Sequence, residues 1–338
     1  MVMREETSSE RSRHAASDSD WLFTRDAGNP IITARDLPYR ANSVFNPAAA
    51  EVEGATKLLM RVEDMRGISH LAVAHSLDGR TGWEFDPKPT FESDPDNHPE
   101  EIWGVEDPRV TWLPEMEEWA VAYTAYSRRG PLVSLAFTRD FKKFRRGGPV
   151  MPPEDKDAAL FPRRLGGRWA LIHRPSPLHG PSHVWISYSP DLVHWGDHAL
   201  LLPAREGAWW DAGKIGLGPP PLETPEGWLV MYHGVHQTAS GSLYRLGFAL
   251  LDLEDPRIVL RRGDEWVFGP TETYERSGDV VGVTFPCGWI FDPATDELRI
   301  YYGASDSTVC LATARLTQVL DYVRACPRPE HRRASDRP

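Results

Sequence analysis

Charged side chains recur beside short apolar segments of this chain. The segment GVEDPRV, residues 104–110, places Glu106 and Asp107 directly before a proline and Arg109. A carboxyl group in such a turn could act as a general acid, or it could only cap a strand. For one segment the second interpretation is sufficient, because Arg109 can form a solvated ion pair with Glu106.

Comparable polar residues follow or interrupt other apolar segments. They are Asn46, Arg61, Glu63, Asp64, Lys156, Asp157, His173, Arg174, Asp211, Lys214, His233, Tyr244 and Asp306. For each residue alone a structural role is the simpler explanation, and His233 could be a core histidine. Buried charges have to be paired or bound to a ligand, however, so their recurrence favours one shared polar pocket. Trp103, Trp209 and Trp210 adjoin these charges and offer flat faces on which sugar rings can stack.

The elements that would carry these residues are mostly short strands. Segments such as KLLMRVE, LAVAHS, WAVAYTAYS, LVSLAFT, RWALIHR, VWISYS and GWLVMYHGV are rich in β-branched and aromatic residues and lie between turn residues. The 30 prolines and 27 glycines suit a chain that turns often. One segment, LTQVLDYVRA, has a helical period, with Leu316, Val319, Leu320 and Val323 on one face.

A unit recurs along the predicted strands. A strand of small residues ends in Ser/Thr-x-Asp and is followed by an aromatic residue at Ser76, Thr138 and Ser189; a degraded version begins at Leu250, and LATARLTQVL, from Leu311, is a candidate fifth copy. Each copy alone is ordinary turn chemistry. A spacing of roughly 50 to 65 residues, however, is typical of β-propellers with one blade per repeat. We therefore predict an all-β fold, a five-bladed β-propeller with a short C-terminal helix.

The composition limits the partners. Among 338 residues, 38 Lys and Arg stand against 49 Asp and Glu, so the formal net charge is −11. This balance argues against a partner that is a nucleic acid or an anionic membrane. An anion site would need a local basic cluster. Three widely spaced cysteines form no CxxC pair and the histidines show no HxxxH spacing, so we expect no metal and no other cofactor.

The chain also lacks the signals of membrane insertion and secretion. No apolar run approaches the ~18 residues that a membrane span needs, and the N-terminal segment has no apolar stretch like that of a secretion signal. We expect a cytoplasmic protein with one propeller domain over residues 21–325. Disordered tails are expected at residues 1–20 and 326–338. The sequence leaves the oligomeric state open, a homo-oligomer included.

Eight segments together resemble one known family. ANSVFNPAA, RVED, GVEDPR, KDAALFP, HRP, WWDAGKIGLGPPP, YHGV and YRLGFALLDLEDP follow one another as in glycoside hydrolase family 130, the β-mannoside phosphorylases and related mannosidases. The resemblance extends from about residue 28 to residue 325, and its long Trp-Trp-Asp to Pro-Pro-Pro segment is highly specific. It implies a five-bladed propeller, in agreement with the repeats.

The resemblance also implies roles for single residues. Asp107 corresponds to the family's catalytic acid, whose proton is thought to pass through the mannose 3-hydroxyl. The residues that correspond to the −1 mannose subsite are Asn46, Arg61, Arg109 and Asp306. The residues that correspond to the phosphate site are Arg174, Lys214, His233 and Tyr244. Lys156 stands where some members carry an arginine, and we assign it to the phosphate site as well.

This inventory implies inverting phosphorolysis of a β-linked mannoside, with inorganic phosphate as co-substrate and α-D-mannose 1-phosphate as product. An inverting hydrolase needs a second carboxylate to activate water, whereas phosphate is already anionic and needs cations to hold it. Two alternatives stay open: a β-mannoside hydrolase on the same fold, and a non-catalytic sugar-binding propeller. The sequence does not fix the linkage that is cleaved or the sugar in the +1 subsite.

Overall fold

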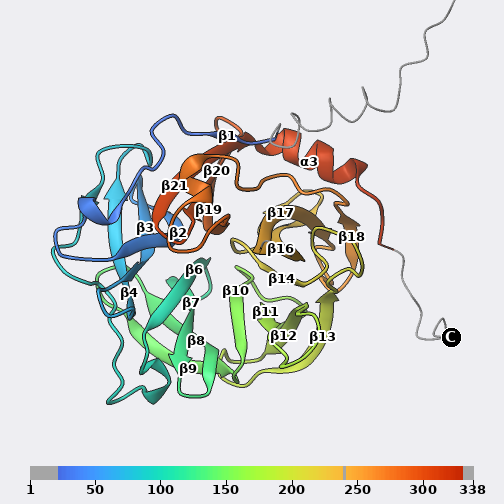
Figure 1. Ribbon diagram of the computed structural model, residues 1–338. Coiled ribbons are helices and arrows are strands. Elements are labelled where there is room, and N and C mark those ends of the chain that lie inside the picture. Colours follow the sequence, from blue (N-terminus) through green and yellow to red (C-terminus); the bar gives the residue numbers. More distant parts are fainter. Residues whose placement is uncertain (1–21, 239–240, 330–338) are drawn as a thin grey trace, which may run out of the picture.

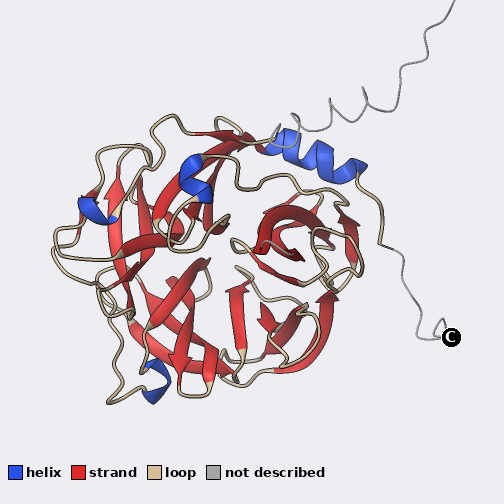
Figure 2. Cartoon of the chain, in the orientation of Figure 1, coloured by secondary structure: helices blue, strands red, loops and turns tan. Residues whose placement is uncertain are grey.

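The computed structural model describes residues 22–238 and 241–329. Within these ranges the strands form five antiparallel sheets that surround one axis (Figure 1). Figure 2 shows that strands make up most of the regular structure, with a few short helices around them. The predicted all-β, five-bladed propeller with a C-terminal helix is therefore confirmed.

Blades 1 to 3 each consist of four consecutive strands, counted outward from the axis. Blade 1 contains β2 (Ser43–Val52), β3 (Ala55–Glu63), β4 (Ser69–Ser76) and β5 (Glu84–Phe85). Blade 2 contains β6 (Val105–Leu113), β7 (Glu118–Ser127), β8 (Gly130–Thr138) and β9 (Arg145–Met151). Blade 3 contains β10 (Asp155–Leu160), β11 (Trp169–Pro175), β12 (Val184–Ser189) and β13 (Gly196–Leu202).

Blades 4 and 5 depart from this plan. Blade 4 contains β14 (Lys214–Leu217), β16 (Gly227–Thr238), β17 (Gly241–Leu251) and β18 (Val259–Arg262), with β15 (Leu222–Thr224) also paired to β16. Blade 5 contains β19 (Thr284–Asp292), β20 (Glu297–Ala304), β21 (Thr308–Arg315) and β1 (Thr24–Arg25). The helices are the 3-10 turns η1 (Ala34–Asp36) and η2 (Pro99–Glu101) and the α-helices α2 (Thr273–Arg276) and α3 (Leu316–Ala325).

The ring closes through the two ends of the described chain. In blade 5 the outermost strand is β1, whose Thr24 and Arg25 lie opposite Thr313 and Ala312 of β21. Because β1 already fills the outer position, the chain leaves β21 directly into α3. The candidate fifth repeat is therefore a third strand followed by a helix. This helix buries the apolar face that its period predicts.

The repeated turns occupy one place in the blades. In blades 1 to 3 the motif joins the third strand to the outermost strand, and the hydroxyls of Ser76, Thr138 and Ser189 accept main-chain hydrogen bonds of 3.1, 3.0 and 2.8 Å from the third residue after them. In blade 4, Asp252 at the corresponding turn accepts bonds from the main chain of Glu254 and Asp255. Side chains of this kind cap turns by bonding to the nearby backbone, so the repeat marks blade edges.

The apolar core lies between the blades and not on the axis. Five buried clusters each join strands of two neighbouring blades; one includes Leu135 of β8 and Leu171 of β11, and another includes Met231 of β16 and Ile300 of β20. This arrangement lets each sheet bury both faces. The inner ends of β2, β6, β10, β14 and β19 surround the centre in Figure 1, where polar side chains can gather.

The expected tails lie largely outside the described residues, which exclude residues 1–21 and 330–338. Residues 326–329 are described: Cys326 is buried, and the main-chain N–H of Arg262 donates a 3.2 Å hydrogen bond to the carbonyl oxygen of Pro327. In the described parts of the chain, no helix has the length and apolar character needed to cross a membrane.

Candidate active site

A polar pocket of about 120 Å³ lies on the axis of the propeller, and all five blades contribute to it. All of the predicted site residues except Arg109 line it. The complete lining is Asn46, Arg61, Asp107, Lys156, Asp157, Arg174, Lys214, His233, Tyr244, Val280, Val283, Phe285 and Asp306. The fold thus brings together residues that are far apart in the sequence.

Bulges in the innermost strands direct three of these side chains into the pocket. The strand register shifts between Phe45 and Ala48 in β2, between Glu106 and Arg109 in β6, and between Lys156 and Ala159 in β10. The residues inside these bulges are Asn46, Asp107 and Asp157, with φ of 47°, 48° and 53°. Asn and Asp tolerate this left-handed conformation better than most residues, and a bulge can redirect a side chain.

The position of the bulges corrects the interpretation of GVEDPRV as a turn. Asp107 and its neighbours lie inside β6, and the proline after Asp107 is accommodated because the bulge interrupts the hydrogen-bonded ladder.

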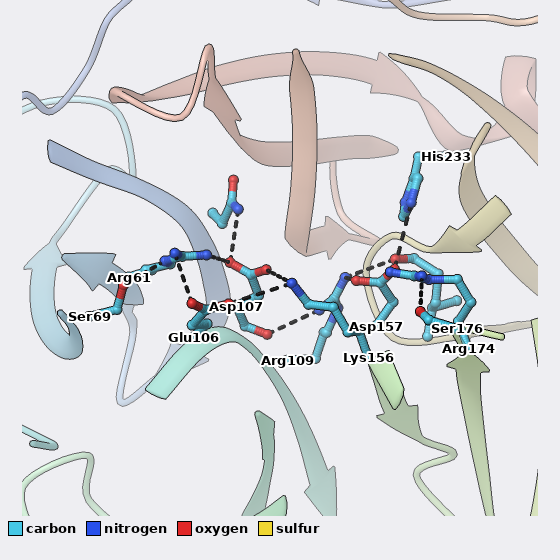
Figure 3. A network of polar contacts seen from close by, with 12 residues as sticks. Arg61, Ser69, Glu106, Asp107, Arg109, Lys156, Asp157, Arg174, Ser176 and His233 are labelled. Atoms are coloured by element: carbon cyan, nitrogen blue, oxygen red, sulfur yellow. Dashed lines mark hydrogen bonds and ion pairs between the residues drawn. The ribbon is translucent and has the colours of Figure 1, made fainter. Parts of the chain in front are cut away.

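Asp107 is held from several sides. Its Oδ1 accepts hydrogen bonds of 2.9 Å from Asn46 Nδ2 and 3.1 Å from Arg61 Nη1, and Lys156 Nζ lies 4.0 Å from its Oδ2 (Figure 3). Burial alone would raise the pKa of Asp107, but the positive charges of Arg61, Lys156 and Arg109 outweigh it and lower the pKa below its usual value. In the free protein this carboxyl group is therefore ionised at neutral pH.

Glu106 completes the same cluster. Its Oε1 lies 3.0 Å from Arg61 Nη2, and its Oε2 lies 3.5 Å from Lys156 Nζ. Lys156 therefore lies beside the two carboxylates of β6, nearer to the acid than its assignment to the phosphate site suggests. We call the lining residues Asn46, Arg61, Asp107, Lys156 and Asp306, together with Glu106 next to them, the acid half of the pocket.

Asp306 differs from Asp107 in its ionisation. It lies in the turn between β20 and β21, with φ of 50°. Burial and the nearby negative charge of Asp107 raise the pKa of Asp306 to about 6, although Arg61 and Lys156 oppose this shift. Near pH 6 the acid half therefore holds one ionised aspartate and one that is partly protonated.

The opposite part of the pocket, which we call the basic half, consists of Asp157, Arg174, Lys214, His233 and Tyr244. Arg174 Nε donates a 2.8 Å hydrogen bond to Asp157 Oδ2, and its Nη1 donates one of 2.6 Å to Ser176 Oγ. Lys214 Nζ lies 5.2 Å from the centre of the Tyr244 ring and pairs with no carboxylate in the described parts of the chain. Lys214 is therefore the cation in this half whose charge is not balanced.

His233 contributes no positive charge at neutral pH. Burial lowers its pKa to about 3, even though Asp157 Oδ2 lies 3.6 Å from its Nε2. Its ring stacks on Tyr244, with ring centres 6.0 Å apart, and its Nδ1 has no hydrogen-bond partner among the described residues. The positive charge of the basic half therefore comes from Arg174 and Lys214.

Arg109 is buried and does not line the pocket, so its expected contact with the sugar stays a prediction. Only 1% of it is exposed, and its guanidinium donates hydrogen bonds to the carbonyl oxygens of Asp107, Leu217 and Gly218 at 3.0, 2.8 and 3.1 Å. Its Nη2 also lies 3.5 Å from Asp157 Oδ1. Arg109 thus joins the two halves of the site from below, between β6 and β14.

Some residues in or next to the pocket were not assigned roles from the sequence. Asp157 and Glu106 were only counted among the charges, although Asp157 occupies the same bulge position in β10 as Asn46 in β2 and Asp107 in β6. Aligning the three innermost strands would have revealed it. Val280, Val283 and Phe285 carry no sequence signal, since they are apolar residues in and after a loop. In the described residues no group of three or more His, Cys, Asp or Glu could hold a metal ion.

Comparisons with known proteins agree with this geometry. A family model described as beta-1,4-mannooligosaccharide phosphorylase (Glyco_hydro_130) matches residues 22–325. The chain is 36% identical over 319 residues to the beta-1,4-mannooligosaccharide phosphorylase of Ruminococcus albus, covering 92% of this chain and 93% of the relative.

Solved structures give the same result. The beta-1,2-mannobiose phosphorylase of Listeria innocua in complex with beta-1,2-mannobiose superposes with a TM-score of 0.81 at 29% identity, covering 89% of this chain and 99% of that one. A structure described with glycoside hydrolases of the same family that target beta-1,2 mannosidic linkages in Candida mannan has a TM-score of 0.76 at 27% identity, covering 86% and 93%. From the family model and these similarities, the chain belongs to glycoside hydrolase family 130.

Proposed function

We propose that this protein is a β-mannoside phosphorylase, which cleaves a β-linked mannoside with inorganic phosphate and releases α-D-mannose 1-phosphate. The observation that carries this proposal is the unbalanced Lys214, which shares one small pocket with Arg174 and the carboxyl group of Asp107. The protein as a whole has a net charge of −11 and repels anions, so only a local positive cluster of this kind can attract one. The phosphorylases to which the chain is similar support the same activity.

The two halves suit the two substrates. The acid half would hold the mannose ring with Asn46, Arg61 and Asp306, and the basic half would bind phosphate through Arg174 and Lys214. Arginine offers a fork of donors and lysine a point charge, a combination that suits a phosphate group. Phosphate held across the ring from the leaving sugar attacks C1 from the opposite face. The configuration at C1 is therefore inverted.

Asp107 would supply the proton for the leaving group. Its lowered pKa means that the free protein holds it ionised, so it has to gain a proton before it can act. Phosphate bound beside Arg174 and Lys214 adds negative charge, which opposes the effect of the cations and raises the pKa of Asp107. Binding of the nucleophile and protonation of the acid are thereby coupled, whether the proton passes directly or through a sugar hydroxyl.

A β-mannoside hydrolase needs a carboxylate that can act as a base across the ring. Asp157 is the carboxylate in the basic half, but it accepts the 2.8 Å hydrogen bond from Arg174. Burial alone would raise the pKa of Asp157, whereas the positive charges of Arg174, Arg109 and Lys156 lower it far below its usual value. A carboxylate of such low basicity is a poor base for water, and this favours phosphorolysis.

The experiment that tests the proposal is a panel of β-1,4-mannobiose, β-1,2-mannobiose, longer β-1,4-manno-oligosaccharides and 4-O-β-mannosyl-glucose, each incubated with and without orthophosphate. We expect cleavage that depends on phosphate, α-mannose 1-phosphate as product, and the reverse reaction from that sugar phosphate and an acceptor. Free mannose formed at the same rate without phosphate would identify a hydrolase. Binding without any cleavage would identify a sugar-binding propeller.

A further inference from the structure

Behind the basic half, blade 3 carries a chain of four hydrogen-bonded side chains. Asp155 Oδ2 lies 2.6 Å from His173 Nδ1, His173 Nε2 lies 2.7 Å from Ser187 Oγ, and Ser187 Oγ lies 2.7 Å from His198 Nδ1. The first three residues are buried and His198 is exposed. We call these four residues the blade 3 network. It borders a second cavity, of about 390 Å³, which is separate from the axial pocket.

The blade 3 network holds the main chain of Arg174. Asp155 Oδ1 accepts a 3.1 Å hydrogen bond from the main-chain N–H of Arg174. In the strand register Asp155 lies opposite Pro175, which has no N–H to donate to the ladder. A side-chain carboxylate therefore supplies a contact to β11 at the point where the proline weakens its pairing with β10.

The corresponding positions in blade 1 need no such network. Arg61 lies opposite Phe45, just before the bulge of β2, and Arg174 has the same place in β11 relative to the bulge of β10. In blade 1 the places of the aspartate and the histidine are taken by Val44 and Met60, which are fully buried. Apolar residues thus satisfy the packing between blades. Burying a carboxyl group and an imidazole instead is costly unless both are hydrogen-bonded; here they bond to each other, and the second oxygen of Asp155 bonds to the main chain of Arg174.

We propose that Asp155 and His173 are positioning residues for Arg174 and, through it, for phosphate. The inference rests on the proposed function, since it assigns Arg174 to the phosphate. His173 donates its Nδ1–H to Asp155, and its Nε2 accepts the hydroxyl proton of Ser187, which fixes the ring. Asp155 in turn fixes the main chain of Arg174, whose guanidinium is already bound to Asp157 and Ser176. Both ends of the Arg174 side chain are then held before phosphate arrives.

A matched pair of substitutions at His173 tests this assignment. The amide of asparagine can occupy the place of Nδ1 and donate to Asp155, whereas the longer glutamine places its amide near Nε2 and loses that bond. We expect His173→Gln to raise the phosphate KM roughly tenfold or more with an unchanged mannoside KM, and His173→Asn to stay close to the parent. Asp155→Asn should raise the phosphate KM like the glutamine variant.

The control is Tyr123→Phe, which removes a buried 2.7 Å hydrogen bond to Glu101 in blade 2. It should lower the melting temperature without changing the phosphate KM. Equal effects of the two His173 variants, or an unchanged phosphate KM in Asp155→Asn, would overturn the assignment. If His173→Gln does not fold, the comparison of Asp155→Asn with His173→Asn replaces it: a raised phosphate KM in Asp155→Asn alone supports the assignment, and equal values overturn it.

Calorimetry with orthophosphate separates this inference from the proposed function. A parent protein that binds orthophosphate, with weaker binding in His173→Gln, supports the positioning role without reference to turnover. If cleavage by the parent depends on phosphate but the His173 and Asp155 variants bind orthophosphate as tightly as the parent does, the positioning role alone is overturned. A parent that binds no orthophosphate overturns both.

Discussion

The acid half and the basic half of the axial pocket differ in how their charges are balanced. In the acid half, Arg61 contacts both Glu106 and Asp107, and Lys156 lies near the same two carboxylates. In the basic half, Arg174 is paired with Asp157, but Lys214 has no carboxylate partner in the described parts of the chain. In the acid half both cations therefore have carboxylate partners, whereas the basic half keeps a positive charge that an anion can balance.

This difference separates two tasks within one pocket. Side chains that already hold one another lose little freedom when a neutral sugar binds, so the acid half is preorganised for the mannose ring. Because Lys214 forms no ion pair with a carboxylate in the described parts of the chain, phosphate can bind to it without breaking one. The comparison predicts that substitutions in the two halves affect different kinetic constants.

The largest effect is expected from Asp107→Asn in the acid half. The amide is nearly the same size but cannot donate the proton, so kcat should fall by roughly 10³-fold or more. Circular dichroism and thermal unfolding should show that the fold is retained. Turnover equal to that of the parent would show that Asp107 is not the acid, and the proposed division of tasks between the two halves would be wrong.

A smaller effect, on a different constant, is expected from Lys214→Ala in the basic half. Loss of one charged contact to phosphate should raise the phosphate KM by roughly 10- to 100-fold, with little change in the mannoside KM. The control is Lys142→Ala, at an exposed lysine on the blade 2 surface. An increase in the mannoside KM that matches the increase in the phosphate KM would contradict the division of tasks.

The smallest effect concerns stability and pH. Folding raises the pKa of Asp306 to about 6, compared with ~3.9 for an unfolded aspartate, so its contribution to stability is lost as the pH rises through 6. Asp306→Asn carries no such charge. At pH 8 the free energy of unfolding of the Asp306→Asn variant should exceed that of the parent by on the order of 1 to 3 kcal/mol. This difference should shrink toward pH 4. Urea denaturation at several pH values measures this, and a difference independent of pH would contradict it.

Local patterns in the sequence were sufficient to predict the blades. The turns at Ser76, Thr138 and Ser189 are formed by side chains that bond to the backbone two or three residues away, so they repeat visibly in the sequence. The period of α3 is equally local. Asp107 in β6 was harder to place, because aspartate and proline favour turns locally and only the tertiary ladder makes this segment a bulged strand.

The pairing of charges could not be predicted from the sequence. Arg109 is buried because the carbonyl oxygens of Leu217 and Gly218, two blades away, face its guanidinium. The neutral state of His233 follows from its burial, which no motif encodes. Most of the residues that the family resemblance implied line the pocket, but the resemblance could not show which cations already form ion pairs with carboxylates.

The pairing of β1 with β21 has a consequence for the synthesis of the protein. Among the described strands, β1 is synthesised first, yet its partner β21 is synthesised last. The contact that closes the ring is therefore also one of the most distant in the sequence, and such contacts form late because long loops have to close. Asp306 lies between β20 and β21, so a nascent chain that has not reached this point lacks part of the pocket. Enzymatic activity should therefore appear only after β21 has been synthesised, and a shorter nascent chain should not consume substrate.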